Sequence, residues 1–245
     1  MTGNTCVVDG ALRNLRRCPK PNPGHDWSTF PNKRASVLVP LIADRSTDTL
    51  HVILTQRVSS LRTHSGEVAL PGGKSDETDV DEIHTATREA QEEIGLDASF
   101  VEIISTHEPA YSLHRILVTP VTGLISDAIL DSSHQDSRTT TGSFTADVLA
   151  SLTPNPEEVA AVFTVPLDYF LRKNGHGEEF VIPEGETQAW RSYTFDYTDE
   201  FGARYYIWGL TAYILVNVAM VAYGRHPDFE CILASERPSN IKSKI

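Results

Sequence analysis

The chain has 245 residues, of which 40% are hydrophobic and 22% are charged. That length supports a sizeable buried core, and the composition is that of a globular protein. The formal net charge of −12 argues against a nucleic-acid-binding surface, which requires clustered lysine and arginine. An acidic protein that acts on a polyanion must neutralise it locally, with a metal ion or with a few placed arginines.

The three cysteines, Cys6, Cys18 and Cys231, lie far apart and form no CxxC pair. Their spacing indicates neither a disulfide framework nor a zinc site. The N-terminus has no apolar run of the kind found in secretory signals. We therefore expect a reducing intracellular compartment.

Residues 1–33 are expected to form an irregular N-terminal extension because several prolines interrupt them. Near Leu12 and Leu15 we favour a short docking helix or a frayed terminus over a weak transit peptide. The β-rich runs 35–43 and 49–56 flank a polar turn and predict a hairpin. Further strands are expected over residues 100–106, 115–125, 178–182, 190–197 and 203–208, with another around Val162.

A helix is predicted over about 80–94, after the glycine-rich stretch 70–73 and a polar loop. Thr78 or Asp79 is the expected N-cap, and Gly95 is the expected C-terminal cap. The polar stretch 126–152 predicts a long surface insertion. A helical turn is expected after Pro166.

Residues 207–224 contain no charge over eighteen positions, which reaches the lower limit for a membrane span. Gly209, Thr211 and Asn217 interrupt the run and no basic flank marks a cytoplasmic side, so we favour a buried core helix over a span. The element order predicts one α/β (α+β) domain over 34–226, with mixed β-sheets sandwiched between helices, and a C-terminal tail over 227–245.

Three glutamates of the predicted helix, Glu89, Glu92 and Glu93, are spaced i, i+3 and i+4 and share one face. The apolar residues form a separate stripe, which allows the helix to dock on a core: Ile83, Ala86, Ala90 and Ile94. Clustered carboxylates repel one another, and a bound Mg²⁺ or Mn²⁺ would remove that repulsion. A solvated acidic face is the equally weighted alternative when the helix is considered alone.

The residues around the helix distinguish a metal site from a solvated acidic face. The sequence from Gly73 to Leu96 resembles the Nudix box, G-x5-E-x7-R-E-U-x-E-E-x-G-U. It contains Gly73, a loop to Asp79, and the run Arg88-Glu89-Ala90-Gln91-Glu92-Glu93-Ile94-Gly95-Leu96. The final part matches completely. Upstream, Asp79 stands where the pattern has glutamate, and eight residues instead of seven precede Arg88. Both departures resemble the coenzyme A diphosphatase subfamily.

A second motif agrees with that subfamily. The stretch that precedes the box in that subfamily has the pattern L-T-x-R-S-x3-L-R-x-H-x-G-x-V-A-F-P-G-G. It is similar to residues 54–57 (LTQR) and 61–73 (LRTHSGEVALPGG) of this sequence. Val58 replaces the common serine, and Leu70 replaces the common phenylalanine. The runs 155–159 and 207–212 are also similar to that group. The resemblance covers about 35–224, without the insertion, and implies a Nudix fold.

The resemblance implies metal-dependent hydrolysis of the pyrophosphate of coenzyme A or its thioesters, to 3′,5′-ADP and a 4′-phosphopantetheine product. It also implies that Glu89 and Glu93 are the main ligands of Mg²⁺ or Mn²⁺, with Glu92 joining them or orienting the water. The general base stays open, with Glu157 or Glu158 as outside contributors. Hydrolysis of another nucleoside diphosphate derivative, such as ADP-ribose or NADH, and a catalytically silent Nudix-fold binding module are the alternatives.

Arg57 and Arg62 are candidate phosphate contacts because the guanidinium fork suits phosphate oxygens, and we favour this over ordinary surface ion pairs. His64 is expected either to bind substrate or to order its loop. Arg88 can pair with a glutamate and hold it in place, while Gly73 and Gly95 are expected to serve backbone turns.

The final residues Ser243-Lys244-Ile245 are similar to a peroxisomal address of the S-K-L type. We therefore favour a peroxisomal site over a cytosolic one, and a mitochondrial site least. A peroxisomal import receptor is the corresponding expected partner, beside a small-molecule substrate, with neither nucleic acid nor a membrane span. The oligomeric state is not predicted.

Overall fold

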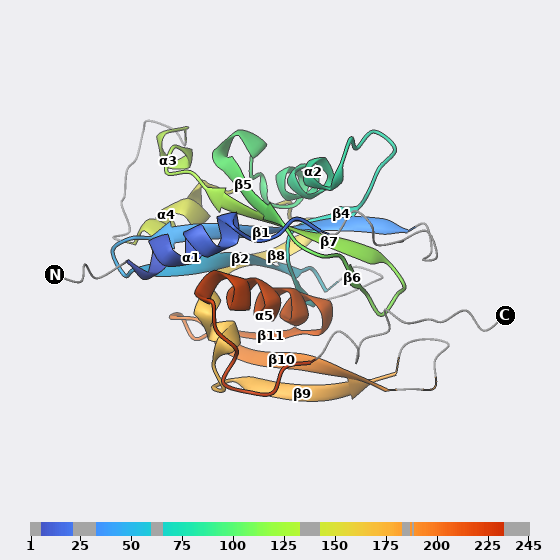
Figure 1. The fold of residues 1–245 in the computed structure, drawn as a ribbon. Coiled ribbons are helices and arrows are strands. Elements are labelled where there is room, and N and C mark those ends of the chain that lie inside the picture. The colour runs from blue at the N-terminus through green and yellow to red at the C-terminus, as the bar shows by residue number, and fades with distance from the viewer. Residues whose placement is uncertain are drawn as a thin grey trace.

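A computed structural model describes residues 6–21, 33–59, 66–132, 143–182, 187 and 189–232, with the side chains of 131 and 132 left aside. Its strands form two sheets, and helices lie on both sides of the larger sheet (Figure 1). The helices and strands follow one another along a single mixed α/β chain, which agrees with the expected fold class.

The larger sheet has eight strands in the order β3-β2-β1-β7-β5, with β4 beside β1, β6 beside β7 and β8 beside β2. Its members are β1 (Arg34–Asp44), β2 (Thr49–Arg57), β3 (Val68–Ala69), β4 (Gly72–Lys74), β5 (Val101–Thr106), β6 (Ala110–Tyr111), β7 (Leu117–Ile125) and β8 (Val159–Pro166). The predicted hairpin is β1 and β2, which pair antiparallel. β1 also pairs parallel with β7, so it lies at the centre of a mixed sheet.

Strand β2 shows why this sheet is covered on both faces. Successive side chains of a strand point to opposite faces. Ile53 packs in the core beneath helix α2 (Glu82–Ile94), whereas Val52 and Leu54 pack in the core that contains helix α5 (Gly209–Tyr223). A strand that is apolar on both faces must lie between two layers.

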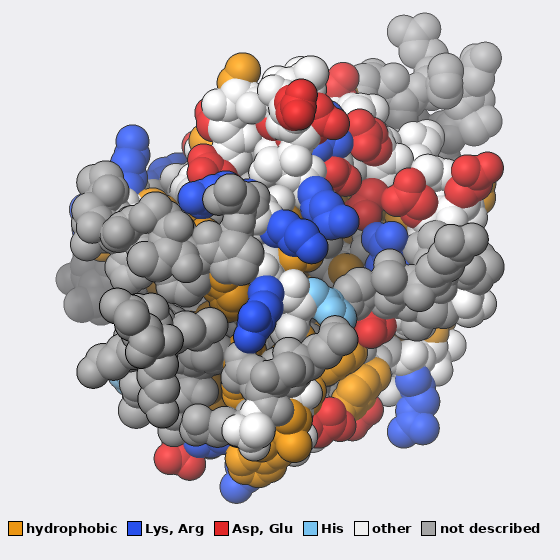
Figure 2. Space-filling view, turned by 90° about the vertical axis from the view of Figure 1, so that its right-hand side faces the viewer, with side chains coloured by type: hydrophobic (Ala, Val, Ile, Leu, Met, Phe, Trp, Pro, Cys, Tyr) orange, Lys and Arg blue, Asp and Glu red, His pale blue; other side chains and the backbone are white. Residues whose placement is uncertain are grey.

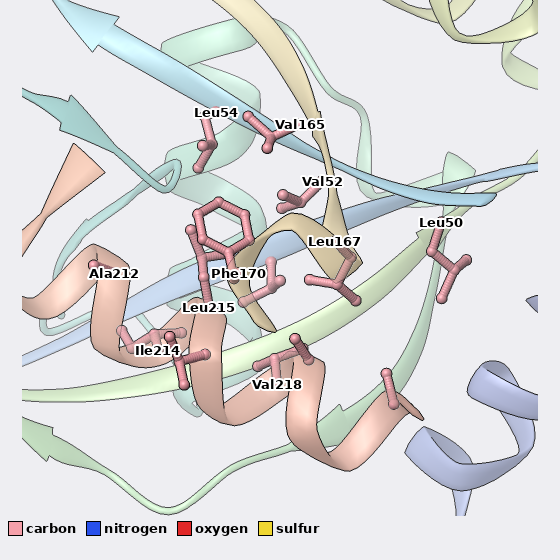
Figure 3. Packing of buried hydrophobic residues seen from close by; sticks show 14 of the residues in the cluster. Leu50, Val52, Leu54, Val165, Leu167, Phe170, Ala212, Ile214, Leu215 and Val218 are labelled. Carbon is pink, nitrogen blue, oxygen red and sulfur yellow. The ribbon is translucent and has the colours of Figure 1, made fainter. Parts of the chain in front are cut away.

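The second sheet has three strands in the order β11-β10-β9: β9 (His176–Val181), β10 (Trp190–Thr198) and β11 (Arg204–Trp208). Helix α5 follows β11 directly and lies between the two sheets in Figure 1. Its side chains, among them Leu215 and Val218, pack with residues of β2, β8 and the 3₁₀ turn Leu167–Leu171 (Figure 3). This burial explains the uncharged run, and no helix among the described residues is long and apolar enough to cross a membrane.

The N-terminal region contains a docked helix, one of the two expected alternatives, and is not irregular over these residues. Helix α1 spans Val7–Arg16 and buries Val8, Ala11, Leu12 and Leu15, spaced i, i+3/4 and i+7, in the same core as α5. The carboxylate of Asp48 accepts hydrogen bonds from the amides of Val7 and Val8 at 2.8 and 2.9 Å, which caps the helix from the β1–β2 turn. The prolines of this region all follow α1 in the chain, so they do not interrupt it.

Helix α2 covers the opposite face of the large sheet, with Ala86, Ala90 and Ile94 fully buried as predicted. Two helices of the predicted insertion, α3 (Ile129–Ser132) and α4 (Phe144–Ser151), lie on the same side. Val148 of α4 is fully buried in the core beneath α2. Residues 143–152 are therefore packed against the domain and do not form a surface insertion. A few apolar side chains in a polar segment are enough to hold it on the core.

One half-buried histidine connects β5 to β7. His107 Nε2 lies 2.7 Å from Thr122 Oγ1 and 3.2 Å from Ser105 Oγ, and its Nδ1 lies 3.9 Å from Cys18 Sγ. Burial disfavours the imidazolium and lowers the pKa of His107 to about 4. The folded protein therefore holds this ring neutral at pH values where the unfolded chain would protonate it.

This histidine predicts an acid-sensitive stability. A depressed pKa gives stability that is present above the unfolded pKa and is lost as the pH falls towards the folded one. Between pH 7 and 5 the His107 contribution should fall by about 2 kcal/mol. Urea unfolding of wild type and His107→Gln at both pH values isolates it, since all other groups are shared. Equal losses in the two proteins would contradict the assignment.

Candidate functional site

Helix α2 presents the predicted carboxylates, and its two ends are fixed by local hydrogen bonds. Asp81, not Thr78 or Asp79, is the N-cap: its carboxylate accepts from the amide of His84 at 2.7 Å. Gly95 closes the other end in the left-handed conformation, with φ 68°, as expected for a C-terminal cap. Glycine adopts this conformation at little steric cost.

Asp79 has a different role from the one expected, because it binds Arg88. Arg88 Nε and Nη2 each lie 3.0 Å from one carboxylate oxygen of Asp79, a bidentate pair. Thr85 Oγ1 and the amide of Asp76 donate to the same carboxylate at 2.9 and 2.8 Å. The Arg88 guanidinium is the main cause of a strongly lowered pKa of Asp79. The loop before α2 is thus fastened to the helix by a nearly buried ion pair.

Glu93 is the most buried of the three glutamates, with only 3% of its surface exposed. Its carboxylate accepts from the amide of Gly72 at 3.2 Å and lies 3.1 Å from Arg57 Nη1. Desolvation raises the pKa of Glu93 to about 7, and the amide of Gly72 and the charge of Arg57 oppose that effect. This carboxylate lies against the backbone of β4.

Glu89 lies one turn earlier and also faces β4. A side chain added at Gly73 would place its Cβ 2.4 Å from the Glu89 carboxylate carbon, so only glycine leaves space for this group. Arg88 Nη2 lies 3.0 Å from Glu89 Oε1. Desolvation raises the pKa of Glu89, an effect to which the charges of Glu92 and Glu158 add.

Glu92 lies on the same side of α2 as the other two but is more exposed. Its side chain is 57% exposed and pairs with Arg88 Nη1 at 3.2 Å, one turn away. Glu89 and Glu93 are four residues apart and point to β4, whereas Glu92 is three residues from Glu89 and has rotated towards solvent. Spacing places the three on one side of α2, but only two of them contact β4.

Glu158 joins the site from the segment that precedes β8. Its charge contributes to the raised pKa of both Glu89 and Glu93, whereas the exposed Glu157 is not among the causes. The amide of Asn155 donates to the Glu93 carbonyl at 2.9 Å, which holds this segment at the end of α2. Of the two acids expected as outside contributors, Glu158 therefore has the larger electrostatic effect on the cluster.

The cationic side chains are only partly described. Arg57 pairs with Glu93 and is 23% exposed, so its position combines an ion pair with access to the cluster. Arg62, His64 and Ser243–Ile245 lie outside the described residues. Figure 2 shows the face around this site: acidic side chains gather in the upper part, and lysine and arginine side chains lie below them.

The chemistry of these donors fits a hard divalent cation. Glu89, Glu93 and Glu158 offer only oxygen ligands, and repulsion from the charge of Glu158 contributes to the raised pKa values of Glu89 and Glu93. Among the described residues, however, no three acidic, histidine or cysteine side chains converge tightly enough to hold a metal ion as they stand. In this arrangement Glu93 is directed to Arg57 and Gly72 instead.

Comparison with known proteins identifies the family. The model of the NUDIX domain matches residues 32–199, more than half of the chain. The chain belongs to the Nudix family. The fold expectation is thereby confirmed, since the matched region contains the large sheet, α2 and the site on it.

Two relatives extend this comparison. Nudix hydrolase 15, mitochondrial, from Arabidopsis thaliana is 43% identical over 205 residues, covering 83% of this chain and 64% of the relative. Peroxisomal coenzyme A diphosphatase NUDT7 from Mus musculus is 35% identical over 225 residues, covering 91% of this chain and 84% of the relative. The chain spans less than two thirds of the length of the curated plant relatives that it matches.

A solved structure also matches, at a lower level. The crystal structure of a Caenorhabditis elegans Ap4A hydrolase binary complex is 16% identical, covers 56% of this chain and 81% of its own, and has a TM-score of 0.37. A likeness of that size carries no argument about substrate.

The Asp79–Arg88 pair predicts a stability difference between arginine and lysine. Arg88→Lys keeps the charge but loses the planar fork, and should lower the free energy of unfolding by about 1.5–3 kcal/mol. Arg225→Lys is the matched control, because the Arg225–Asp228 pair is exposed on both sides and should cost about 0–0.5 kcal/mol. Chemical denaturation measures the change in the free energy of unfolding for each variant. Equal changes would show that the bidentate contact with Asp79 does not add to stability.

Proposed function

We propose that this protein hydrolyses the pyrophosphate of coenzyme A or its thioesters, using a divalent cation, to 3′,5′-ADP and (acyl-)4′-phosphopantetheine. The observation that carries the proposal is the packing of two desolvated carboxylates, Glu89 and Glu93, against Gly72-Gly73, with Arg57 beside them. The similarity to a coenzyme A diphosphatase over 91% of this chain supports the choice of substrate.

Glu89 and Glu93 are the proposed ligands of Mg²⁺ or Mn²⁺, with Glu158 next to them. A cation there would supply neutralisation of phosphate charge and a lower pKa for the attacking water. The protein itself positions the substrate in this proposal. β4 approaches α2 closely because residues 72 and 73 are glycines, and this leaves room for phosphate oxygens to reach the carboxylate cluster. Exposed Glu92 is the proposed group for orienting water.

Arg57 is the proposed phosphate contact. It lies 23% exposed beside Glu93, and its guanidinium has further donors besides the one directed to Glu93. A substrate that carries two phosphates in the diphosphate and a third on the ribose adds negative charge to an already acidic site. The fixed guanidinium of Arg57 therefore attracts the anionic substrate, whereas the net charge of −12 of the whole chain repels it.

The substrate assignment predicts a defined product. With Mg²⁺ or Mn²⁺, free coenzyme A or an acyl-CoA should release 3′,5′-ADP, measured by chromatography, and chelation with EDTA should abolish release. Parallel assays with ADP-ribose and NADH test the rival substrates. If either is turned over as fast as every CoA substrate, the coenzyme A assignment is wrong, and a protein inert towards all of them fits a silent binding module.

The role of Glu93 predicts loss of turnover without loss of fold. Glu93→Gln keeps the shape of a buried side chain, and its neutral amide avoids the cost of a desolvated charge. We expect the turnover number to fall at least 100-fold, on the order expected for removal of a group that positions a catalytic charge. Thermal unfolding verifies the fold, and unchanged turnover would overturn the metal-site proposal.

The peroxisomal location stays a prediction. One relative is named peroxisomal, whereas the two plant relatives are named mitochondrial and chloroplastic. A fluorescent protein fused ahead of the chain, with and without Ser243–Ile245, tests the C-terminal address, and one fused behind the chain leaves the N-terminus free for mitochondrial or chloroplastic import.

A further inference from the structure

Ser36 is a polar residue near the start of β1, a strand on which α2 packs. Its side chain is fully buried, and its Oγ has no hydrogen-bond partner among the described residues. Burying a hydroxyl without a partner costs free energy, so buried polar groups are almost always paired. An exception of this kind is therefore a candidate for a role in ligand binding or catalysis.

The alternation of side chains along β1 places Ser36 on the face that α2 covers. Successive residues of a strand point to opposite faces. Leu38 and Ile42, an even number of residues from Ser36, are fully buried in the core beneath α2. Val39 and Leu41, an odd number of residues away, belong to the core that contains α5. Ser36 therefore points towards α2, at the end of a strand face that is otherwise part of an apolar core.

The neighbour of Ser36 on β4 is Gly73. The two residues lie directly opposite each other in the antiparallel pair of β1 and β4. Side chains in such a pair point to the same face, with Cβ atoms about 4.5–5.5 Å apart. A Cβ at Gly73 would lie 2.4 Å from the carboxylate carbon of Glu89, so the Cβ of Ser36 lies at most about 8 Å from that carbon. The unpaired hydroxyl is thus a near neighbour of one of the two proposed cation ligands.

The guanidinium that faces Glu89 is shared with two other acids. Arg88 Nη2 lies 3.0 Å from Glu89 Oε1, and the same side chain binds Asp79 and Glu92. Desolvation raises the pKa of Glu89, which shows that its charge is poorly compensated where it lies. An ionised carboxylate has about four sites that accept hydrogen bonds, so Glu89 can accept a further donor.

Cation binding requires the glutamates to change their side-chain torsions. In the described part of the chain, no three acidic, histidine or cysteine side chains converge tightly enough to hold a metal ion. A carboxylate that binds a metal ion is normally held in place by a hydrogen bond from a neighbouring group. The Ser36 hydroxyl lies on the sheet beneath Glu89 with an unpaired proton, and the Glu89 side chain has enough rotatable bonds to reach it.

We propose that Ser36 is a positioning residue for Glu89, whose carboxylate accepts a hydrogen bond from the Ser36 hydroxyl when it binds the cation. The inference rests on the proposed function. The hydroxyl orients the carboxylate and leaves lone pairs for the cation. The cost of burying the hydroxyl is then compensated in the cation complex. Ser36 is accordingly a residue that favours binding at the expense of the stability of the fold.

Removal of the hydroxyl tests this role, because Ser36→Ala changes the volume of the side chain very little. Mn²⁺ binding, measured by electron paramagnetic resonance, should weaken about tenfold, as expected when a metal ligand loses its hydrogen-bond partner. Ser192→Ala is the matched control, since Ser192 is also a buried strand serine but lies in the small sheet, and it should bind Mn²⁺ as wild type does. Equal Mn²⁺ affinities of wild type and Ser36→Ala overturn the inference.

Stability separates positioning from a structural role of the same hydroxyl. In urea unfolding with EDTA present, Ser36→Ala should have a free energy of unfolding equal to or higher than that of wild type, because the variant no longer buries an unpaired hydroxyl. A lower value shows that the hydroxyl stabilises the fold itself, which overturns the proposal.

The kinetics distinguish this inference from the proposed function. In Ser36→Ala the Mn²⁺ concentration for half-maximal release of 3′,5′-ADP should rise about tenfold, whereas kcat at saturating Mn²⁺ and KM for the CoA substrate stay as in wild type. An active wild type with an unchanged Mn²⁺ requirement in Ser36→Ala defeats the Ser36 assignment alone. A wild type that binds Mn²⁺ but releases no 3′,5′-ADP defeats the proposed substrate, and the Mn²⁺ affinities then still decide the role of Ser36.

Discussion

The burial of the Glu93 carboxylate is the constraint on which the site depends. A desolvated charge requires close partners, and here they are the amide of Gly72 and the guanidinium of Arg57. To supply that amide, β4 must run directly between β1 and α2. A Cβ at Gly72 would lie 2.5 Å from the Ser36 carbonyl oxygen and 2.6 Å from Val37 Cα, so no other residue fits there without moving the backbone. The glycine pair and the glutamate therefore form one structural unit, although twenty residues separate them in the chain.

Arg88 fastens the loop before α2 to the helix and gives the glutamates of α2 different electrostatic surroundings. It binds Asp79 with its fork and also contacts Glu89 and Glu92, so one positive charge is shared among three carboxylates. The acids it does not contact, Glu93 and Glu158, act on one another through charge repulsion. The three helix glutamates consequently occupy three environments: Glu93 is buried, Glu89 is packed against Gly73, and Glu92 faces solvent. This asymmetry provides distinct roles for residues that look equivalent in the sequence.

The sequence predicted the features that follow from periodicity and from local turn chemistry. The β1–β2 hairpin, the apolar stripe of α2 and the Gly95 cap are all where pattern reasoning places them, because each depends on neighbouring residues. The length and firm packing of helix α1, the docking of α4 and the bidentate Asp79–Arg88 pair were not predicted, since each depends on partners distant in the chain. The four buried residues of α1, for example, do have helical spacing, but only the cap by Asp48 and the surface of α5 make so short a helix stable. Likewise, Glu157 and Glu158 are indistinguishable in sequence, and only the fold places one of them beside Glu93.

We propose that Glu89 and Glu93, with Glu158 next to them, bind a divalent cation, and Mn²⁺ binding measured by electron paramagnetic resonance tests this without any assay of turnover. Free Mn²⁺ gives a strong signal that decreases on binding, so titration of wild type and of single glutamine variants gives each affinity. The account predicts that Glu93→Gln abolishes binding at the wild-type site and that Glu158→Gln weakens it. Glu157→Gln, one residue away and exposed, should bind Mn²⁺ as wild type does. Equal affinities of wild type and Glu93→Gln would contradict the account.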